Sequence, residues 1–527
     1  GLERQKMTEG KELIKYFCVP CKPTKSNGNR TRNRPCHDIN KWETFKKYCM
    51  RDVDVERQIA DKLKMYPISD EEHRLYVLDQ IINDRGVLVD SELAEQAVKL
   101  NSIQTAVAVE QAYMITGLEN PNSVTQLKQW LKEKGVEIES LSKKSVKSLA
   151  DETDGDVSEM LKLRLLMAKT SVKKYEAVIR SVCSDNRVHG MMRFCGANRT
   201  GRWSGNILQP QNLPQNHLPD LTLARDIVKD GDFEMLDMMF GNVPNVLSEL
   251  IRTVLIPKPN HRFIVADFSA IEARVLAWIA GEQWRIDTFK NGGDIYCASA
   301  SKMFKVPVEK HGVNGELRQK GKISELACGY GGSVGALKNM GAVEMGVQEN
   351  ELQGLINDWR NANPHIVRFW YEVGNAAMKA IKEKTTVPLG KLVFAYERGI
   401  LFIRLPSGRR LTYIKPRIGT NRFGGDSITY MGINSAKKWD RLETFGGKLT
   451  ENIVQGTARD LLANALINAA NAGYDTVFHV HDEIICEVPN GYGSVDELCK
   501  LMCIKPEWAD GLPLNADGFE CEYYKKE

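Results

Sequence analysis

A single aspartate stands at the end of an apolar segment that predicts a buried strand. The segment reads RFIVADF at 262–268, and its acid is Asp267. The apolar residues from Ile271 to Ile279 then repeat at helical spacing, and Gly281 ends that pattern. Asp267 therefore lies where a strand ends, and its carboxylate projects from a rigid edge. Taken alone, an acidic turn residue is the commoner explanation.

A second group of acids lies inside an apolar hairpin. Two strand-like segments, TVFHV and IICEV, flank His481, Asp482 and Glu483. Unpaired carboxylates packed against apolar strands are destabilising, and a bound cation removes that penalty. Oxygen ligands suit Mg²⁺, so Asp267 and Asp482 from separate strands could jointly hold two Mg²⁺ ions about 4 Å apart.

Residues 316–332 (ELRQKGKISELACGYGG) combine two cations with an aromatic ring. Arg318, Lys322, Leu326 and Tyr330 recur every four residues, which predicts one broad helix face. Cations at one end and a ring at the other fit a nucleoside triphosphate, with the cations on its phosphates. By itself the pattern fits a solvated charged helix better. The sequence contains no GxxxxGK[ST] motif, which argues against a Walker phosphate loop.

The elements that position these residues are a mixture of helices and short strands. Residues 41–65 have helical spacing, Pro67 interrupts it, and a new helix begins near Ser69. Residues 91–180 read as a run of helices, and 449–466 as another helix. This mixture predicts an α+β architecture.

Composition sets broad limits on the chain. A length of 527 residues predicts two to four compact units. Residues 1–35 hold nine Lys or Arg against three Glu, so the rest of the chain, with a total of +4, carries −2. A net charge of this size does not establish a nucleic-acid partner, because a basic nucleic-acid cleft and an acidic metal site would partly cancel. No apolar run approaches the length of a membrane span, and twelve scattered cysteines predict reduced thiols in a cytoplasmic setting.

One cysteine cluster differs from the rest. Cys18, Cys21, Cys36 and His37 form a CxxC followed by Cys-His, which could bind zinc. Adjacent residues are awkward as ligands of one tetrahedral site, however. We therefore favour free cysteines in a basic loop at 22–37 and keep zinc as the alternative.

In order and spacing, the three segments resemble the motifs of family A DNA polymerases, the group of bacterial DNA polymerase I, and the phage-type branch is closest. The matches are Asp267–Arg274 (DFSAIEAR) for motif A, Arg318, Lys322, Tyr330 and Gly331 for motif B, and His481, Asp482 and Glu483 for motif C. Three further stretches are similar to segments of the family that contact DNA: Thr200-Gly201-Arg202 with Gln211-Asn212-Leu213-Pro214, Gln455–Ala458, and Lys169-Thr170-Ser171 through Tyr175.

The resemblance implies a right-hand polymerase fold, with a truncated 3′–5′ exonuclease domain at its N-terminus. Tyr48 and Asp52 match the last exonuclease motif, YxxxD, but its earlier acidic motifs are not in this chain, so no exonuclease activity is expected. The implied divisions are 1–67 for the exonuclease remnant, 68–90 leading into the palm, 91–182 for the thumb, 183–274 and 441–527 for the palm, and 275–440 for the fingers.

The resemblance also implies roles for individual residues. The activity would be template-directed addition of deoxynucleotides to a primer by a monomer, with two Mg²⁺ ions for which Mn²⁺ can substitute, and without a membrane. The implied residues are Asp267, Phe268 (through its carbonyl) and Asp482 for metal; Asp267, Asp482, Lys322 and Glu483 for catalysis; Arg318, Lys322, Leu326, Tyr330 and Glu272 for the nucleotide; and Lys169, Thr170, Arg202, Gln211, Asn212, Gln455 and His481 for primer and template.

A single-subunit RNA polymerase is the alternative, because those enzymes share the Arg/Lys helix and the palm carboxylates. Glu272 argues against it, since a bulky acid there excludes a ribose 2′-hydroxyl in the DNA enzymes. Three positions depart from the family: Leu326, which is commonly aromatic, Trp203, where Leu is usual, and Glu451, where many members carry Asn. Because Leu326 lacks a hydroxyl, we expect strong discrimination against dideoxynucleotides.

Overall fold

The computed structural model describes residues 7–167, 173–421 and 424–526. The chain forms two compact units, Gly1–Leu75 and Tyr76–Glu527. Among the helices of the described residues, none combines the length and the apolar character needed to span a bilayer. The first unit contains α1 (Gly10–Cys18) and α2 (Ile39–Leu63), and the division falls inside α3 (Asp70–Arg85).

An aromatic cluster holds the first unit together. The Phe17 ring of α1 packs edge-on against Trp42 and stacks on Phe45 of α2, with centroids 5.2 and 5.4 Å away. This confirms the helix that the sequence predicts at 41–65. Within the described residues no three His, Cys, Asp or Glu side chains group to hold a metal, and the thiol of Cys21 donates to the Arg30 carbonyl.

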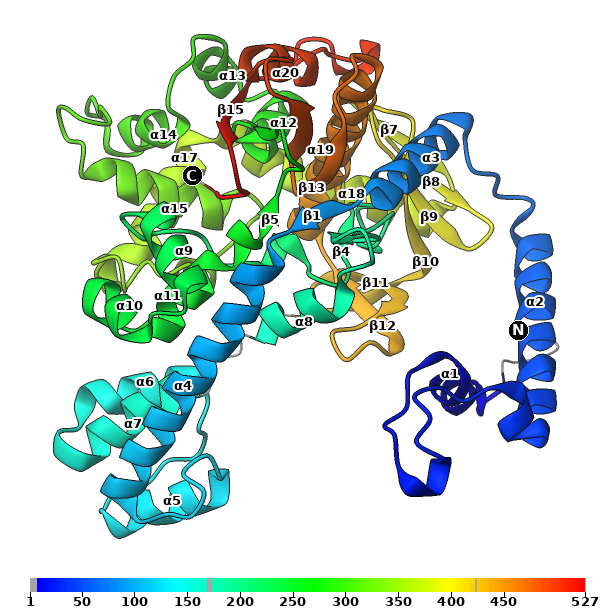
Figure 1. Cartoon of the computed structure of the whole chain (residues 1–527). Coiled ribbons are helices and arrows are strands. Elements are labelled where there is room, and N and C mark those ends of the chain that lie inside the picture. The colour runs from blue at the N-terminus through cyan, green and yellow to red at the C-terminus, as the bar shows by residue number, and fades with distance from the viewer. Residues whose placement is uncertain (1–6, 168–172, 422–423, 527) are drawn as a thin grey trace. The chain divides into compact units, whose positions relative to one another are not determined.

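The second unit is built on a four-stranded antiparallel sheet in the order β13-β14-β6-β15. Its two edge strands, β13 and β15, are labelled in Figure 1. The predicted strands at 262–268, 476–480 and 484–488 are all present. In the sheet register Asp267 lies directly between Glu483 on one side and Asp517 on the other. The register therefore brings three acids into one row. The strands are β6 (His261–Phe268), β13 (Thr476–Val480), β14 (Glu483–Pro489) and β15 (Ala516–Cys521).

The helices that precede β6 in the chain form two hydrophobic cores, and the long helix α4 contributes residues to both. Leu93, Ala97 and Leu100 pack into the core that also contains Phe263 and Val265 of β6. Ala108 and Ala112 of the same helix pack with α5, α6 and α7 in a separate core. These elements are α4 (Ser91–Thr116), α5 (Val124–Glu133), α6 (Lys143–Glu152), α7 (Gly155–Met167), α8 (Lys173–Ser181), α9 (Leu221–Asp230), α10 (Phe233–Phe240) and α11 (Val243–Leu250).

The helices that follow β6 are those that the motifs require. Gly281, in the left-handed conformation, ends α12 as predicted. Helix α15 ends at Cys328, so Tyr330 lies beyond the helix and the predicted four-residue face is wrong at its last member. Three glycines around Tyr330 (Gly329, Gly331 and Gly332) explain the early end. These helices are α12 (Ile271–Ala280), α13 (Gln283–Lys290), α14 (Ile295–Phe304), α15 (Leu317–Cys328), α16 (Val334–Asn339), α17 (Leu352–Ala362), α18 (Pro364–Glu383), α19 (Gly446–Asn471) and α20 (Val495–Met502).

A second sheet of six antiparallel strands lies between α18 and α19 in sequence, and the sequence analysis missed it. It is a meander in which each strand pairs with its neighbour along the chain, from β7 to β12. One face packs on α18 and α19 through residues such as Phe394, Ile403 and Tyr413. The strands are β7 (Thr386–Leu389), β8 (Leu392–Glu397), β9 (Ile400–Arg404), β10 (Arg410–Thr420), β11 (Asp426–Ile433) and β12 (Trp439–Thr444).

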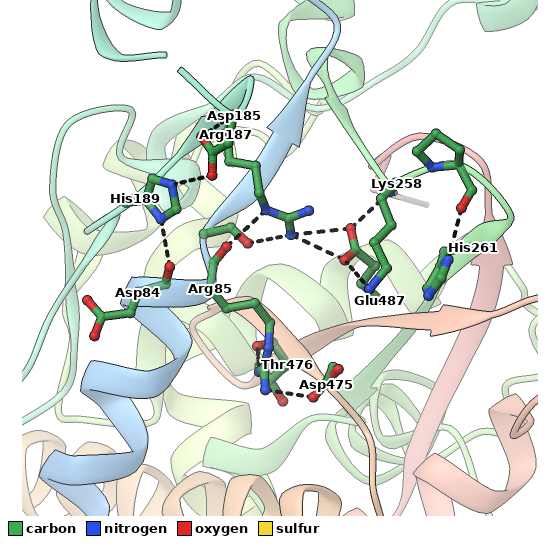
Figure 2. A network of polar contacts seen from close by, with 12 residues as sticks. Asp84, Arg85, Asp185, Arg187, His189, Lys258, His261, Asp475, Thr476 and Glu487 are labelled. Atoms are coloured by element: carbon green, nitrogen blue, oxygen red, sulfur yellow. Dashed lines mark hydrogen bonds and ion pairs between the residues drawn. The ribbon is translucent and has the colours of Figure 1, made fainter. Parts of the chain in front are cut away.

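A buried carboxylate ties the start of the second unit to the four-stranded sheet (Figure 2). Glu487 of β14 is 3% exposed and accepts from Arg187 Nη2 and from the amide of Lys258. The Arg187 guanidinium also donates to the carbonyls of Arg85 and Gly86. Small strands complete this connection: β1 (Val87–Val89), β2 (Arg187–Val188) and β5 (Leu255–Ile256), with β3 (Met192–Arg193) paired to β4 (Ser204–Gly205) nearby in sequence.

A buried cluster fixes the loop that carries Arg202. The Trp203 indole donates to Asp79 Oδ1 at 2.8 Å, and its ring meets the His479 ring edge-on at 4.7 Å. The Arg459 guanidinium lies 4.9 Å above the Trp203 ring and donates to the Gly201 carbonyl. Burial lowers the pKa of His479 to about 3, and the charge of Arg459 acts in the same direction.

We predict that His479 makes the second unit sensitive to acid. The pKa of His479 is lower in the folded chain than in the unfolded one, so protonation of His479 favours the unfolded chain. Its effect on the free energy of unfolding is therefore absent above about pH 6.5, and that free energy falls as the pH drops from 6.5 toward 3. The loss is about 1.4 kcal/mol per pH unit. Urea unfolding at pH 7, 6 and 5 should show a weaker pH dependence for His479→Gln than for the wild type. The exposed control His311→Gln should match the wild type, and an unchanged dependence in His479→Gln would contradict the prediction.

Candidate active site

Asp267 lies at the end of β6 in a crowded, negatively charged setting. Its side chain is 44% exposed and stands opposite Glu483. Burial raises the pKa of Asp267 to about 7, and the neighbouring carboxylates of Glu483 and Asp482 act in the same direction. The Lys526 ammonium, 3.8 Å from Asp267 Oδ2, opposes that shift. The site therefore holds more negative charge than its protein cations balance.

Asp482 occupies the turn between β13 and β14. Its neighbour His481 has a φ of 55°, a left-handed conformation that a residue with a side chain adopts only when its surroundings enforce it. The amide of Phe268 donates to the Asp482 carbonyl at 3.3 Å. This bond ties the turn to the end of β6, so the two predicted metal ligands come from adjacent backbone segments.

Arg202 links Asp482 to the next part of the site. Its Nη2 lies 3.3 Å from both carboxylate oxygens of Asp482, and its Nη1 donates to Glu272 Oε1 at 2.8 Å. The other oxygen of Glu272 accepts from the Tyr330 hydroxyl at 2.6 Å. A continuous polar chain therefore runs from the β13–β14 turn through α12 to the segment after α15.

The C-terminal segment supplies two residues that the sequence analysis missed. The buried Tyr524 hydroxyl donates to Glu483 Oε1 at 2.6 Å, and Arg252 donates to that hydroxyl at 3.1 Å. The Lys526 ammonium lies 3.5 Å from Glu483 Oε2 and 3.8 Å from Asp267. Nothing in the sequence marks these residues, because the contacts join positions far apart along the chain.

The two predicted phosphate-binding cations lie one turn apart on α15. Arg318 pairs with Asp294 at 2.8 Å, and its guanidinium lies 5.2 Å from the Tyr296 ring centroid. Asp294 also accepts from two backbone amides at the start of α14. Lys322 makes no ion pair with any residue that the structure describes. The sequence analysis did not find Asp294 as the partner of Arg318.

An open cleft of about 670 Å³ brings half of the predicted site residues together. The two aspartates line it together with Leu326, which is 51% exposed. Arg318 and Lys322 are not among its lining residues. Of the predicted residues, the cleft is lined by Asp267, Phe268, Glu272, Leu326, Tyr330, Gln455, His481 and Asp482, and also by Glu451.

The remaining predicted primer and template residues lie elsewhere. Gln211 contacts the sulfur of Met192 and lines a small hollow together with Arg202. Asn212 is exposed. Lys169 and Thr170 lie outside the described residues.

The carboxylates fit a divalent cation. Their donors are oxygens only, and Mg²⁺ is commonly held by one or two carboxylates together with phosphate oxygens. Among the described residues no three His, Cys, Asp or Glu side chains group to hold a metal by themselves. Burial and the neighbouring carboxylates raise the pKa of Asp267, and a bound cation would favour its ionised form.

Comparison with known proteins identifies the family. The model of "DNA polymerase family A" matches residues 91–507. A DNA polymerase of Bacillus phage SP02 is 53% identical over 529 residues, covering 100% of this chain and 82% of that protein. DNA polymerase I of Rhizobium leguminosarum is 29% identical over 45% of this chain, which is only 20% of its own length.

A solved structure shares the fold. The POL domain of Pol1 from M. smegmatis, in complex with DNA primer-template and dNTP, has a TM-score of 0.60 and 20% identity, covering 98% of this chain and 79% of that one. The family match, the phage relative and this fold agree with the motifs and with the cleft that unites them. The chain belongs to DNA polymerase family A and is a template-directed DNA polymerase with the palm, thumb and fingers fold.

Proposed function

We propose that the cleft carries out two-metal phosphoryl transfer from a deoxynucleoside triphosphate to a primer 3′ end. The observation that carries the proposal is the convergence of Asp267 and Asp482, from adjacent strand ends, in one cleft with Glu272, Leu326 and Tyr330. Glu483 is held beside them by Tyr524. The proposed partners are primer–template DNA and deoxynucleoside triphosphates, as in the complex of the M. smegmatis domain.

Asp267, Asp482 and the carbonyl of Phe268 would hold the metal ions, Mg²⁺ or Mn²⁺ in its place. When bound, the two ions would supply a lowered pKa for the primer 3′-hydroxyl and charge neutralisation for the leaving pyrophosphate. Asp482 forms an ion pair with Arg202, and Asp267 lies near Lys526. Both protein cations would have to share these carboxylates with the incoming metal.

Arg318 and Lys322 would act on the phosphates. Negative charge grows on them during transfer, and fixed cations lower the energy of that state. Asp294 keeps the Arg318 guanidinium in one orientation before nucleotide arrives. Lys322, one helical turn further along α15, could also donate a proton to the leaving group.

The DNA would contact several elements around the cleft. Gln455 of α19 and His481 line it and would meet the primer end, and Arg202 contacts both Asp482 and Glu272. Gln211 and Asn212 would contact the strands further from the reacting atoms. The proposed thumb contacts, Lys169 and Thr170, belong to residues outside the described ranges.

Three further proposals concern the chain as a whole. A hydrogen bond to Asp52 raises the pKa of Tyr48. Among the described residues, Asp52 belongs to no group of three His, Cys, Asp or Glu side chains that could hold a metal. We therefore propose that this chain lacks 3′–5′ exonuclease activity.

We also propose that it works as a monomer and, from its phage relative, in the cytoplasm of a bacterial or phage-infected cell.

The metal assignment predicts separate effects on chemistry and on binding. Asp267→Asn or Asp482→Asn should abolish primer extension, because each change removes charge that holds metal. Primer–template affinity should stay within a few-fold, since neither side chain is proposed to grip DNA. Single-turnover extension and fluorescence anisotropy measure the two quantities. A rate above roughly a tenth of the wild-type rate in either variant would refute the assignment.

Glu272 is predicted to exclude ribonucleotides. Both of its oxygens are engaged, by Arg202 and by Tyr330, so the side chain forms a fixed wall of the cleft. Glu272→Ala should raise ribonucleotide incorporation markedly relative to deoxynucleotide incorporation. Glu272→Gln keeps the size of the side chain and one acceptor, and should keep the exclusion. Primer extension with ribonucleotides and with deoxynucleotides in parallel measures this effect. If Glu272→Ala incorporates ribonucleotides no better than the wild type, another residue excludes the 2′-hydroxyl.

Leu326 is predicted to set discrimination against dideoxynucleotides. A dideoxynucleotide lacks the hydroxyl that makes polar contacts, and Leu326 offers no hydroxyl in return. An unpaired polar group costs about 1–3 kcal/mol, or about one to two decades in rate. Leu326→Tyr should relax the discrimination by about tenfold or more, whereas Leu326→Phe, with a ring but no hydroxyl, should not. Equal ratios for the wild type and Leu326→Tyr in single-turnover competition would show that position 326 does not read the sugar.

A further inference from the structure

Positive charge is concentrated in the six-stranded sheet. Residues 386–444 contain eleven Lys or Arg and four Asp or Glu, a net charge of +7. Because the whole chain carries +4, all other residues together carry −3. With residues 1–35 at +6, the sheet is therefore one of two strongly basic parts of the chain, and none of its described residues lines the cleft.

Strand register places much of this charge on one face. Phe394, Ile403 and Tyr413 face the core with α18 and α19. Residues that alternate with them face the other way, and paired positions share a face. The pairs Arg404–Arg410, Arg417–Thr429, Met431–Arg441 and Ile433–Trp439 define that opposite face. We call it the outer sheet face, consisting of Arg404, Arg410, Arg417, Trp439 and Arg441 with the two acids Glu397 and Glu443, and with Lys437 and Lys438 in the adjoining turn.

Most of these cations lack a partner inside the protein. Arg410 lies 3.4 Å from Glu397, but Arg404, Arg417, Lys437 and Lys438 are exposed and make no ion pair with any described residue. Arg404 also stands directly opposite Arg410, and like charges so placed destabilise a sheet. An external polyanion would offset that repulsion, and phosphates spaced along a strand match a row of separate cations.

An exposed aromatic ring lies at the end of this row. Trp439 is 57% exposed, and its cross-strand partner Ile433 is 47% exposed. Within the described residues the indole makes no hydrogen bond or ring contact. An exposed ring among cations suits the stacking of an unpaired base, and bases inside a duplex are not available for such stacking.

We propose that the outer sheet face binds single-stranded DNA, with Trp439 stacking on a base and the surrounding Arg and Lys side chains contacting phosphates. The single strand of a primer–template is the part of the template that has not yet been copied. The site goes beyond the polymerase cleft and shares no residue with it. Its effect is tighter binding of substrates that carry a long unpaired template.

The test compares two primer–templates with the same duplex and with template overhangs of one nucleotide or about twenty nucleotides. Anisotropy without nucleotide or divalent metal gives each dissociation constant, so the result does not depend on the proposed metal ligands. The wild type should bind the long overhang more tightly than the short one. Trp439→Ala should weaken long-overhang binding by about fivefold or more. Trp439→Phe, which keeps a ring, should retain most of the affinity.

Charge removal gives an independent measure. Lys437→Ala/Lys438→Ala should lower the salt dependence of long-overhang binding by about 1.4 in log–log slope, since each phosphate contact on a single strand contributes about 0.7. The matched control Lys62→Ala/Lys64→Ala in α2 removes two exposed lysines from the other unit and should change nothing. Short-overhang binding should be the same in all variants.

Three results would overturn the proposal. The wild type could bind both substrates equally, or the Trp439 and Lys437/Lys438 variants could keep full long-overhang affinity. Equal losses on both substrates would instead assign the face to duplex DNA. Circular dichroism and single-turnover extension on the short-overhang substrate check that each variant is folded and that its cleft is intact.

Discussion

The structure depends most on the balance of charge around three carboxylates at one end of the four-stranded sheet. Asp267, Asp482 and Glu483 lie on adjacent backbone segments, and burial together with the charges of Glu483 and Asp482 raises the pKa of Asp267 to about 7. Arg202 and Lys526 approach them and offset part of the charge. The strand register, the left-handed turn at 481 and the buried support of Glu483 all keep these acids together. The negative charge of this site suits the divalent cations that are proposed to bind with the substrate.

Arg202 connects that charge to the nucleotide pocket. It contacts Asp482 with one nitrogen and Glu272 with another, and Glu272 in turn accepts from Tyr330. The wall that would exclude a 2′-hydroxyl and the carboxylate that would hold metal therefore share one guanidinium. Trp203, one of the three residues that depart from the family pattern, holds the loop that carries Arg202 through its hydrogen bond to Asp79.

Much of the site could be predicted because its residues lie in short patterns with local causes. The apolar run before Asp267, the helix after it and the hairpin around Asp482 each follow from spacing within about ten residues. Contacts between distant segments left no such trace, so Tyr524, Lys526 and Asp294 were missed. The six-stranded sheet was missed although its strands alternate polar and apolar residues, as in Arg410 to Tyr413, and Tyr330 was misplaced because glycines end α15 early.

The claim that Asp267 and Asp482 jointly hold two ions is tested most directly by counting them. Electron paramagnetic resonance of free Mn²⁺ gives the number bound to the complex with a dideoxy-terminated primer–template and the matching nucleotide. The account predicts two Mn²⁺ ions per wild-type chain, and fewer for Asp267→Asn and for Asp482→Asn under the same conditions. Two ions bound equally well by both variants would contradict it.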